Sequence, residues 1–159
     1  MTKTRQALGL VVALAVTFAA AGIGSVFTSQ SVGDWYQQIA KPSWTPPGWL
    51  FGPVWTVLYT LMAVAAWLVW RQGGWGEARL ALGLYAGQLV LNAAWSALFF
   101  GARLPGPAFA ELVVLWLMIV ATTAAFFRKS AVAGVLMLPY AGWTAFAGAL
   151  NFALWRMNA

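Results

Sequence analysis

Apolar residues dominate five stretches of this chain, and charged residues gather between them. Each stretch is long enough, at about 20 residues, to cross the hydrocarbon core of a bilayer as a helix. Prolines mark the start of two of the stretches: Pro46 and Pro47 precede the second, and the fourth starts near Pro105 and Pro107, because proline suits the first turn of a helix. The pattern predicts an all-α integral membrane bundle of five transmembrane helices in a single domain, with spans at approximately 6–28, 48–70, 80–102, 105–127 and 130–155.

The segment 29–47 is the longest predicted connection. Long loops are often functional, and the prolines of this one hold its second half extended. We therefore interpret it as a ligand-covering loop. The first span has an alternative interpretation as a signal peptide, because the sequence AAAGIGS offers small residues for cleavage. Its apolar stretch exceeds the usual length of about 7–15 residues, which favours a retained helix.

Composition excludes several kinds of chemistry. Hydrophobic residues make up 62% of the chain and charged residues 8%, against about 25% charged residues in a soluble domain. Cysteine and histidine are absent, which removes disulfides, thiolate nucleophiles, the usual zinc sites and histidine ligation of haem. With only three acidic residues, we expect no metal site, no required cofactor and no paired-carboxylate catalysis.

The nine basic residues lie near span ends, a pattern typical of topology signals rather than of a nucleic-acid surface. We therefore expect no nucleic-acid partner. The count on the two predicted sides is unequal, which predicts a cytoplasmic N-terminus in a bacterial inner membrane, with the 29–47 loop outside. One side holds Lys3, Arg5, Arg71, Arg79, Arg128 and Lys129, and the other holds Lys41, Arg103 and Arg156.

Eleven tryptophans are the strongest compositional signal. Those at span ends, such as Trp70, are explained by the aromatic belt at the membrane surface. Trp116 and Trp143 instead fall near the middle of predicted spans, and Trp55 and Trp95 lie about two turns inside theirs. Simple packing is the alternative for any one of them, although a buried indole N–H needs a partner.

Polar side chains accompany the deep tryptophans. Gln88, Asn92 and Ser96 recur every four residues and therefore share one face of the third span. We interpret such faces, taken with the aromatic residues, as the lining of a ligand cavity. The alternative is that the amides only hydrogen-bond across helices. The candidate ligand-binding residues are Trp44, Phe51, Trp55, Tyr59, Met62, Gln88, Asn92, Trp95, Trp143, Ala147 and Asn151.

Two further residues interrupt the apolar pattern. Glu111 lies about a turn past Pro107, which favours an interfacial residue at a helix N-terminus over a functional intramembrane acid. Pro139 lies inside the fifth span and leaves the carbonyl of residue 135 without its N–H partner. We expect a kink there that helps to open a pocket near Trp143.

Small residues predict close helix contacts. Gly83 and Gly87 have GxxxG spacing in the third span, and Ala141, Ala145 and Ala149 form a smooth stripe on the fifth. Either set is a candidate contact of a homodimer, and close packing within one bundle explains each equally well.

Three stretches together resemble the translocator protein family, whose bacterial members are the tryptophan-rich sensory proteins (TspO/MBR). They are WYQQIAKPSWTPPGWLFGPVWTVLY (35–59), GQLVLNAAWSALFFGAR (87–103) and PYAGWTAFAGALNFALWR (139–156). The likeness covers nearly the whole chain. It implies a five-helix bundle, often dimeric, that binds porphyrins such as protoporphyrin IX and haem under the first loop. Eukaryotic members also bind cholesterol and benzodiazepine-type ligands.

The resemblance also implies candidate photochemistry. Some bacterial members are credited with light- and oxygen-dependent breakdown of protoporphyrin IX, and the two tryptophans tied to it match Trp55 and Trp143. The family's cholesterol motif has a tyrosine where this chain has Phe152, so we expect no dedicated sterol recognition. Since the chain lacks histidine, free-base protoporphyrin suits it better than a redox haem.

The expected function is therefore a membrane receptor or sensor for tetrapyrroles, which the family links to tetrapyrrole and stress responses. Whether slow photo-oxidative breakdown makes it an enzyme stays open at this point. One alternative is a transporter of tetrapyrroles or sterols, although the lack of an inverted repeat argues against a conventional secondary transporter. The other alternative is a scaffold whose tryptophans only pack and anchor.

Overall fold

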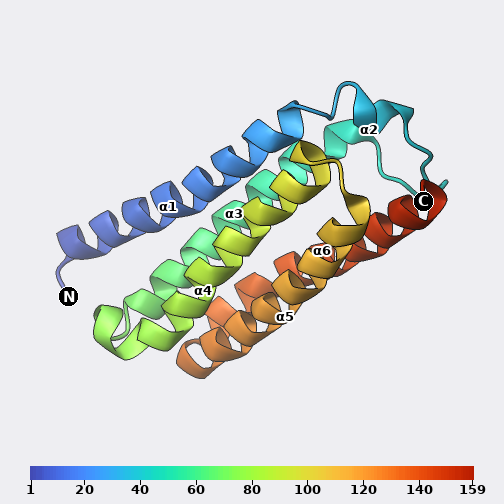
Figure 1. The fold of residues 1–159 in the computed structure, drawn as a ribbon. Coiled ribbons are helices and arrows are strands. Elements are labelled where there is room, and N and C mark those ends of the chain that lie inside the picture. Colours follow the sequence, from blue (N-terminus) through green and yellow to red (C-terminus); the bar gives the residue numbers. More distant parts are fainter.

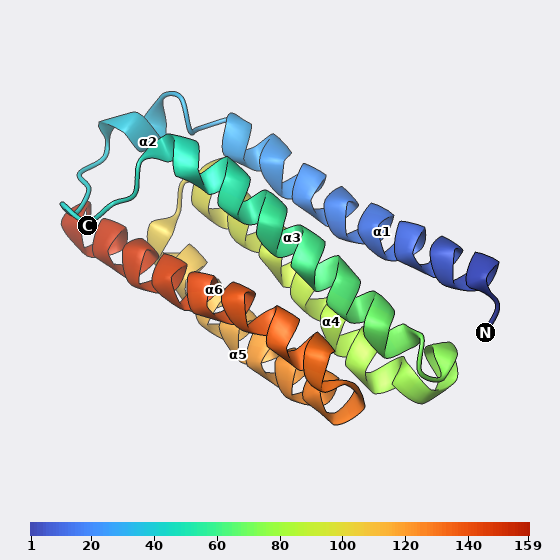
Figure 2. The same ribbon diagram turned by 180° about the vertical axis from the view of Figure 1, so that it is seen from behind.

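The computed structural model describes all residues 1–159, and its regular structure is entirely helical. Five long helices lie side by side (Figures 1 and 2). Each is long and apolar enough to cross a membrane, the third of them together with a π-helical turn, η1 (Ala97–Gly101). The prediction of an all-α five-helix membrane bundle is confirmed. The long helices are α1 (Lys3–Ser29), α3 (Gly48–Trp70), α4 (Gly74–Ser96), α5 (Pro105–Lys129) and α6 (Ala131–Met157).

Helix α1 forms an outer wall of the bundle. It packs on α3 and α4, while α3, α4, α5 and α6 pack on one another around the core (Figure 1). Only Thr17 and Gly24 of α1 are buried. The hydroxyl groups of Thr17 and Tyr85 share a hydrogen bond of 2.6 Å, and the Trp67 indole donates to the Gln6 carbonyl over 2.8 Å. These two bonds fix α1 against α4 and α3, and the Thr17–Tyr85 bond is buried.

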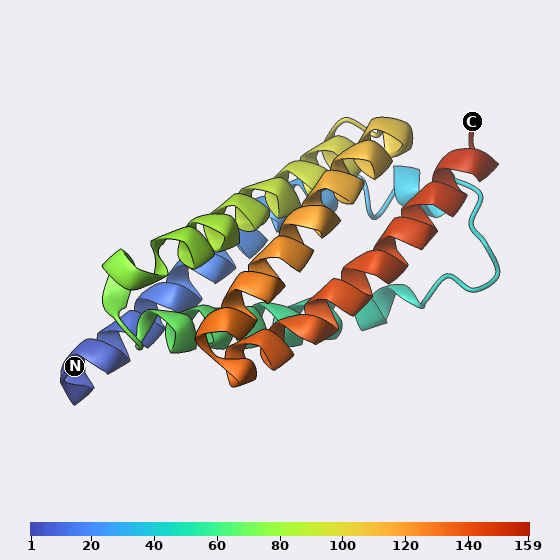
Figure 3. The same cartoon turned by 90° about the horizontal axis from the view of Figure 1, so that it is seen from below.

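The connections divide between the two ends of the bundle. The N-terminus, the α3–α4 turn and the α5–α6 turn lie at one end, and the loop between α1 and α3 lies at the other, beside the C-terminus (Figures 1 and 3). That loop contains one short helix, α2 (Trp35–Gln38). We call its end of the molecule the loop end. The six basic residues counted together in the sequence all fall at the opposite end.

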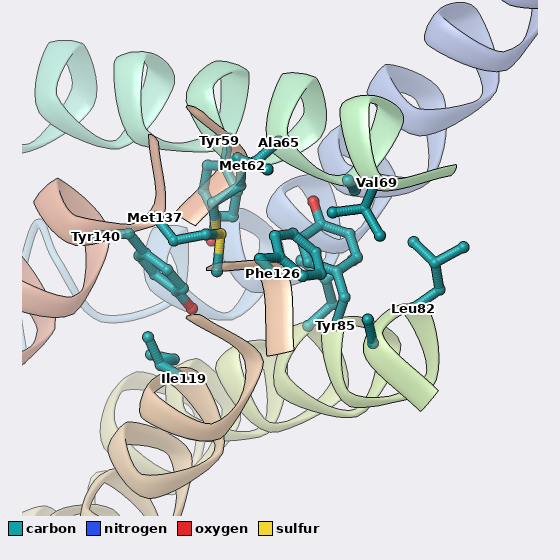
Figure 4. Close-up of a cluster of buried hydrophobic side chains, with 14 of the residues drawn as sticks. Tyr59, Met62, Ala65, Val69, Leu82, Tyr85, Ile119, Phe126, Met137 and Tyr140 are labelled. Carbon is teal, nitrogen blue, oxygen red and sulfur yellow. The ribbon is translucent and has the colours of Figure 1, made fainter. Parts of the chain in front are cut away.

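The apolar core consists of two separate clusters. The large core cluster has 17 buried residues and extends toward the end opposite the loop (Figure 4). It includes Tyr59, Met62, Tyr85, Ile119 and Tyr140. The small core cluster, at the loop end, consists of Tyr36, Phe99, Ala108, Leu150 and Leu154. Partly buried rings connect the two clusters: Trp143 packs on the large one, Phe51 packs on the small one, and their centroids lie 6.0 Å apart.

Some helix bounds differ from the predicted spans for local reasons. Helix α4 begins at Gly74, before the predicted start at residue 80. Gly74 takes the left-handed conformation (φ 72°) that ends the turn after α3, which glycine adopts without strain. Glu77 and Arg79 then occupy the first turns of α4, outside the apolar stretch that hydropathy detects. Pro139 lies inside α6, which continues as one helix through it.

Candidate functional site

The first half of the loop is anchored where α4 ends. The Ser31 hydroxyl donates to the carbonyl of Phe100 in the π-helical turn, and Arg103 Nε donates to Ser31 Oγ over 3.0 Å. Arg103 also pairs with Asp34 at 3.3 Å. Tyr36 packs on the ring of Phe100 with the centroids 5.7 Å apart, and burial raises the pKa of its phenol above the ordinary value. The π-helical turn thus supplies both the carbonyl and the ring that seat the loop.

A second anchor ties the loop to the end of α6. The Ala40 N–H donates to Asn158 Oδ1, and Asn158 Nδ2 donates to the Ala40 carbonyl, each over 2.9 Å. Beyond Ala40, the hydrogen bonds of residues 41–47 stay local: Thr45 donates to the Pro42 carbonyl, and the Pro47 carbonyl accepts from the Leu50 N–H in the first turn of α3. We call residues 41–47 the crossing segment. Its attachment to the bundle therefore depends on its two ends and on the side chains below it.

Four aromatic side chains from the crossing segment, α3 and α6 meet under this segment, and Trp55, one turn beyond Phe51 on α3, packs on the deeper rings of Tyr59 and Tyr140. Ring centroids are 5.8 Å apart for Trp44 and Phe146, 5.3 Å for Phe146 and Trp143, and 6.0 Å for Trp143 and Phe51. Trp44 is 47% exposed, and the other rings are partly buried. The set presents several aromatic faces close to one another at the loop end. We call it the aromatic wall: Trp44, Phe51, Trp55, Trp143 and Phe146.

A network of buried polar groups lies deeper than the wall. Tyr140 donates to Gln88 Oε1 over 2.6 Å and accepts from Asn92 Nδ2 over 2.7 Å, while Tyr59 donates to Asn92 Oδ1 over 3.1 Å. Gln88 Nε2 approaches Met62 Sδ at 3.9 Å. We call these five residues the tyrosine–amide network. Its hydrogen bonds join α3, α4 and α6, so the amides do hold helices together in the way that intramembrane amides often do.

The other two predicted polar residues lie apart from that network. Trp95 donates its indole N–H to Asn151 Oδ1 over 2.9 Å, and Asn151 Nδ2 donates to the Pro105 carbonyl over 2.8 Å. The Trp95 ring stacks on Phe99 with the centroids 5.1 Å apart, which places it against the small core cluster. Ala147, one turn beyond Trp143 on α6, is half-buried. The predicted ligand-binding residues thus divide between the wall, the network and this second polar contact.

Four buried side-chain atoms have no hydrogen-bond partner. They are both carboxyl oxygens of Glu111, the indole nitrogen of Trp143 and the hydroxyl of Thr144. We call these three residues the unpaired layer. Our expectation that Glu111 is an interfacial residue is wrong, because Glu111 lies on the face of α5 that also carries the fully buried Ala108 and Leu115. That face points into the bundle, so the carboxyl oxygens are shielded from water.

The small residues proposed for helix contacts lie mainly on the outside. A Cβ atom added at Gly83 meets nothing within 4 Å, and one at Gly87 meets only Met118, at 3.9 Å. A shallow groove of about 420 Å³ runs past Gly83 and is lined by Arg79, Leu80, Leu84 and Met118. On α6, Ala145 and Ala149 are exposed and Ala141 is half-buried. Close packing within one bundle therefore does not account for the Gly83–Gly87 pair.

Sequence reasoning missed three residues of the site. Tyr140 is central to the network, and its signal was present as the tyrosine next to Pro139, one turn before Trp143. Phe146 joins Trp44 to Trp143, but a single phenylalanine in an apolar helix carries no distinguishing signal. Thr144 resembles any small helix residue in the sequence. The contacts of all three depend on which helices become neighbours.

The fold and these contacts define a class of protein: a multi-pass α-helical membrane protein with an aromatic wall under the loop between α1 and α3. Comparison with known sequences makes this specific. The sequence profile of the TspO/MBR family matches residues 11–156, and the chain belongs to that family.

Full-length relatives agree with this assignment. The chain is 41% identical to the tryptophan-rich protein TspO of Archaeoglobus fulgidus over 152 residues, which cover 96% of this chain and 98% of that protein. It is 45% identical to the human translocator protein over 138 residues, 86% of this chain and 82% of that one. It is 42% identical to the tryptophan-rich sensory protein of Cereibacter sphaeroides, with 92% of each chain covered. It is thus an integral, multi-pass membrane protein of the family that includes these sensory and translocator proteins.

Proposed function

We propose that this protein is a membrane receptor or sensor that binds porphyrins, protoporphyrin IX first among them, between α3 and α6 under the crossing segment. The observation that carries the proposal is the aromatic wall. Three separate chain segments bring indole and phenyl rings to centroid distances of 5.3–6.0 Å, and such faces stack well on a flat macrocycle. A porphyrin would exchange ring–ring contacts of the wall for ring–macrocycle contacts.

The loop end also suits the charged edge of a porphyrin. Propionate groups need cations or N–H donors near the water boundary. Lys41 lies there, with its Nζ 4.7 Å from the centroid of the Tyr36 ring and 3.2 Å from the Ile39 carbonyl. Lys41 is half-buried, and its ammonium group would exchange these two contacts for a charge-assisted hydrogen bond to a propionate. The chain lacks histidine, the commonest ligand of haem iron, which favours the metal-free macrocycle.

Light-dependent breakdown of the bound porphyrin is the second part of the proposal. An illuminated porphyrin passes its excitation to dioxygen, and the reactive oxygen produced attacks the macrocycle or an electron-rich indole beside it. Trp143 and Trp55 are placed for that contact, since Trp143 belongs to the wall next to Phe51 and Trp55 packs at 6.3 Å from Tyr140. The dioxygen supplies the oxidising equivalents, so the chain itself needs no acid–base pair.

The substitution Trp143→Phe tests this part. The Trp143 indole N–H has no partner, so phenylalanine keeps an aromatic ring without breaking a bond within the protein. We expect saturable quenching of tryptophan fluorescence by protoporphyrin IX to persist, and the light-driven loss of porphyrin absorbance to fall at least about tenfold. Trp75→Phe is the matched control, because Trp75 is 58% exposed at the opposite end. Unchanged bleaching in Trp143→Phe would exclude the photochemical role.

We also propose a homodimer and an orientation. The open Gly83 surface of α4, with its groove, suits close approach of a second helix, and cross-linking through cysteines introduced beside Gly83 tests it. The six basic residues at the end opposite the loop favour a cytoplasmic N-terminus, in a bacterial inner membrane. Flux of protoporphyrin IX into liposomes distinguishes a transporter from a receptor, because a receptor binds the ligand without moving it across.

A further inference from the structure

The unpaired layer calls for an explanation because buried polar groups in proteins are nearly always hydrogen-bonded. Within a bilayer, bulk water is not available to complete missing bonds. All four unpartnered buried atoms belong to Glu111, Trp143 and Thr144, on only two neighbouring helices. Thr144 is 1% exposed. An anomaly confined to one place points to a missing partner at that place.

Contacts between α5 and α6 fix the depth of Glu111. Asn151 bonds the Pro105 carbonyl on one side of it, and Trp116 donates to the Ala141 carbonyl over 3.1 Å on the other. Because the two helices run antiparallel, Glu111 lies level with the part of α6 between residues 141 and 151. Thr144 and Trp143 belong to that part. Leu112, next to Glu111, packs against Gly148, so the three residues of the unpaired layer lie within about two turns of one another along the bundle.

The unpaired layer lies between residues of the two core clusters. On α5, Glu111 lies between Leu115 of the large core cluster and Ala108 of the small one. On α6, Thr144 lies between Tyr140 of the large cluster and Leu150 of the small one. Apolar packing continues past this layer, because the buried Leu112 follows Glu111 on α5 and packs against Gly148 of α6. The missing hydrogen bonds are therefore what single the layer out.

We propose that the unpaired layer is a polar subsite in which Glu111 accepts a hydrogen bond from an N–H group of a flat aromatic ligand. The inference rests on the proposed function in one respect, that a planar ligand enters beside the aromatic wall. Trp143 belongs to both the aromatic wall and the unpaired layer. A ligand that stacks on the Trp143 ring would therefore bring its own polar atoms next to Glu111 and Thr144.

The chemistry of the layer selects the ligand class. A carboxyl group without a partner needs hydrogen-bond donors, and the basic residues of this chain all lie near helix ends, away from this depth. The hydroxyl of Thr144 and the indole N–H of Trp143 are the donors on the facing part of α6, and neither bonds Glu111. An N–H group on an aromatic ring system brings the missing donor and a surface for stacking in one molecule, and the two free donors can bind an acceptor on the same ligand.

The test compares two probes that differ only in the donor, carbazole and 9-methylcarbazole. Their affinities for the purified full-length protein in lipid nanodiscs are measured by isothermal titration calorimetry. The ratio of the two affinities is then compared between proteins, because partition of each probe into lipid cancels in that comparison. We expect the ratio to favour carbazole about tenfold more in the original protein than in Glu111→Leu.

Two further variants keep the test decisive. Glu111→Gln retains the shape of the side chain and one acceptor oxygen. Its affinity ratio is therefore expected to lie between those of the original protein and Glu111→Leu. If Glu111→Leu does not fold, Glu111→Gln takes its place in the comparison. Glu77→Gln, an exposed acid at the other end, is expected to leave the ratio unchanged. An equal ratio in the original protein and the Glu111 variants overturns the subsite, as does failure of both probes to bind. Saturable porphyrin quenching alongside that result would leave the proposed function intact.

Discussion

The tyrosine–amide network and the unpaired layer are two sets of buried polar groups in one bundle, and they differ in one respect. In the network, the hydroxyl groups of Tyr59 and Tyr140 bond the amides of Gln88 and Asn92 across three helices. In the unpaired layer, the carboxyl oxygens of Glu111, the indole nitrogen of Trp143 and the hydroxyl of Thr144 have no hydrogen-bond partner. The difference teaches that buried polarity in a membrane bundle has two uses: bonded groups fix the helices, and unbonded groups remain available to a ligand.

The largest effect expected from this comparison is on stability when the network is broken. Tyr140→Phe removes one hydroxyl but leaves two amide groups, of Gln88 and Asn92, without their partner. We expect the free energy of unfolding to fall by about 2–3 kcal/mol, measured by denaturant-induced unfolding in mixed micelles. Tyr36→Phe, at a buried tyrosine outside the network, is the control and should change it by less than about 0.5 kcal/mol. Equal effects of the two substitutions would contradict the role given to the network.

A smaller and local effect is expected at the loop. Asn158→Ala removes both hydrogen bonds that join Ala40 to the end of α6. Hydrogen exchange of the amides of residues 39–47 should then accelerate about tenfold, while exchange in the helices stays as it was. Asn158→Asp keeps the acceptor for the Ala40 N–H and should give an intermediate rate. Exchange in this segment that does not respond to either change would show that the loop is held by other contacts.

The smallest effect is expected in the unpaired layer itself. Thr144→Val replaces a hydroxyl that bonds nothing with a methyl group of similar size, so the free energy of unfolding should stay unchanged or rise by up to about 1 kcal/mol. Thr17→Val is the matched control, because the Thr17 hydroxyl bonds Tyr85, and it should lower stability by about 1 kcal/mol. If both substitutions destabilise the protein equally in chemical unfolding, the Thr144 hydroxyl has a partner in the folded state.

Much of the fold followed from the sequence because lipid imposes simple rules on it. The length of apolar stretches located five helices, and the predicted second span, 48–70, has the same bounds as α3. Periodicity also placed Gln88 and Asn92 on one buried face. These features depend on residues near one another in the chain, which is why hydropathy and helical geometry were enough.

The site was less predictable because its contacts join distant residues. The link from Ala40 to Asn158 has no local signal. Glu111 was misplaced because its distance from Pro107 was given more weight than its register with Ala108 and Leu115, which shows the buried face of α5. The pairing of Trp95 with Asn151 rather than with the wall likewise depends on how α4 and α6 approach each other.

Hydrogen exchange of the protein with and without protoporphyrin IX, in nanodiscs and in the dark, tests the central claim most directly. If the ligand binds beside the aromatic wall, amides of the crossing segment and of the first turns of α3 gain protection, and Asn158→Ala does not remove that gain at saturating ligand. Protection confined to the outer face of α4, around Arg79 and Gly83, with none in residues 41–47, would place the ligand elsewhere and contradict the account.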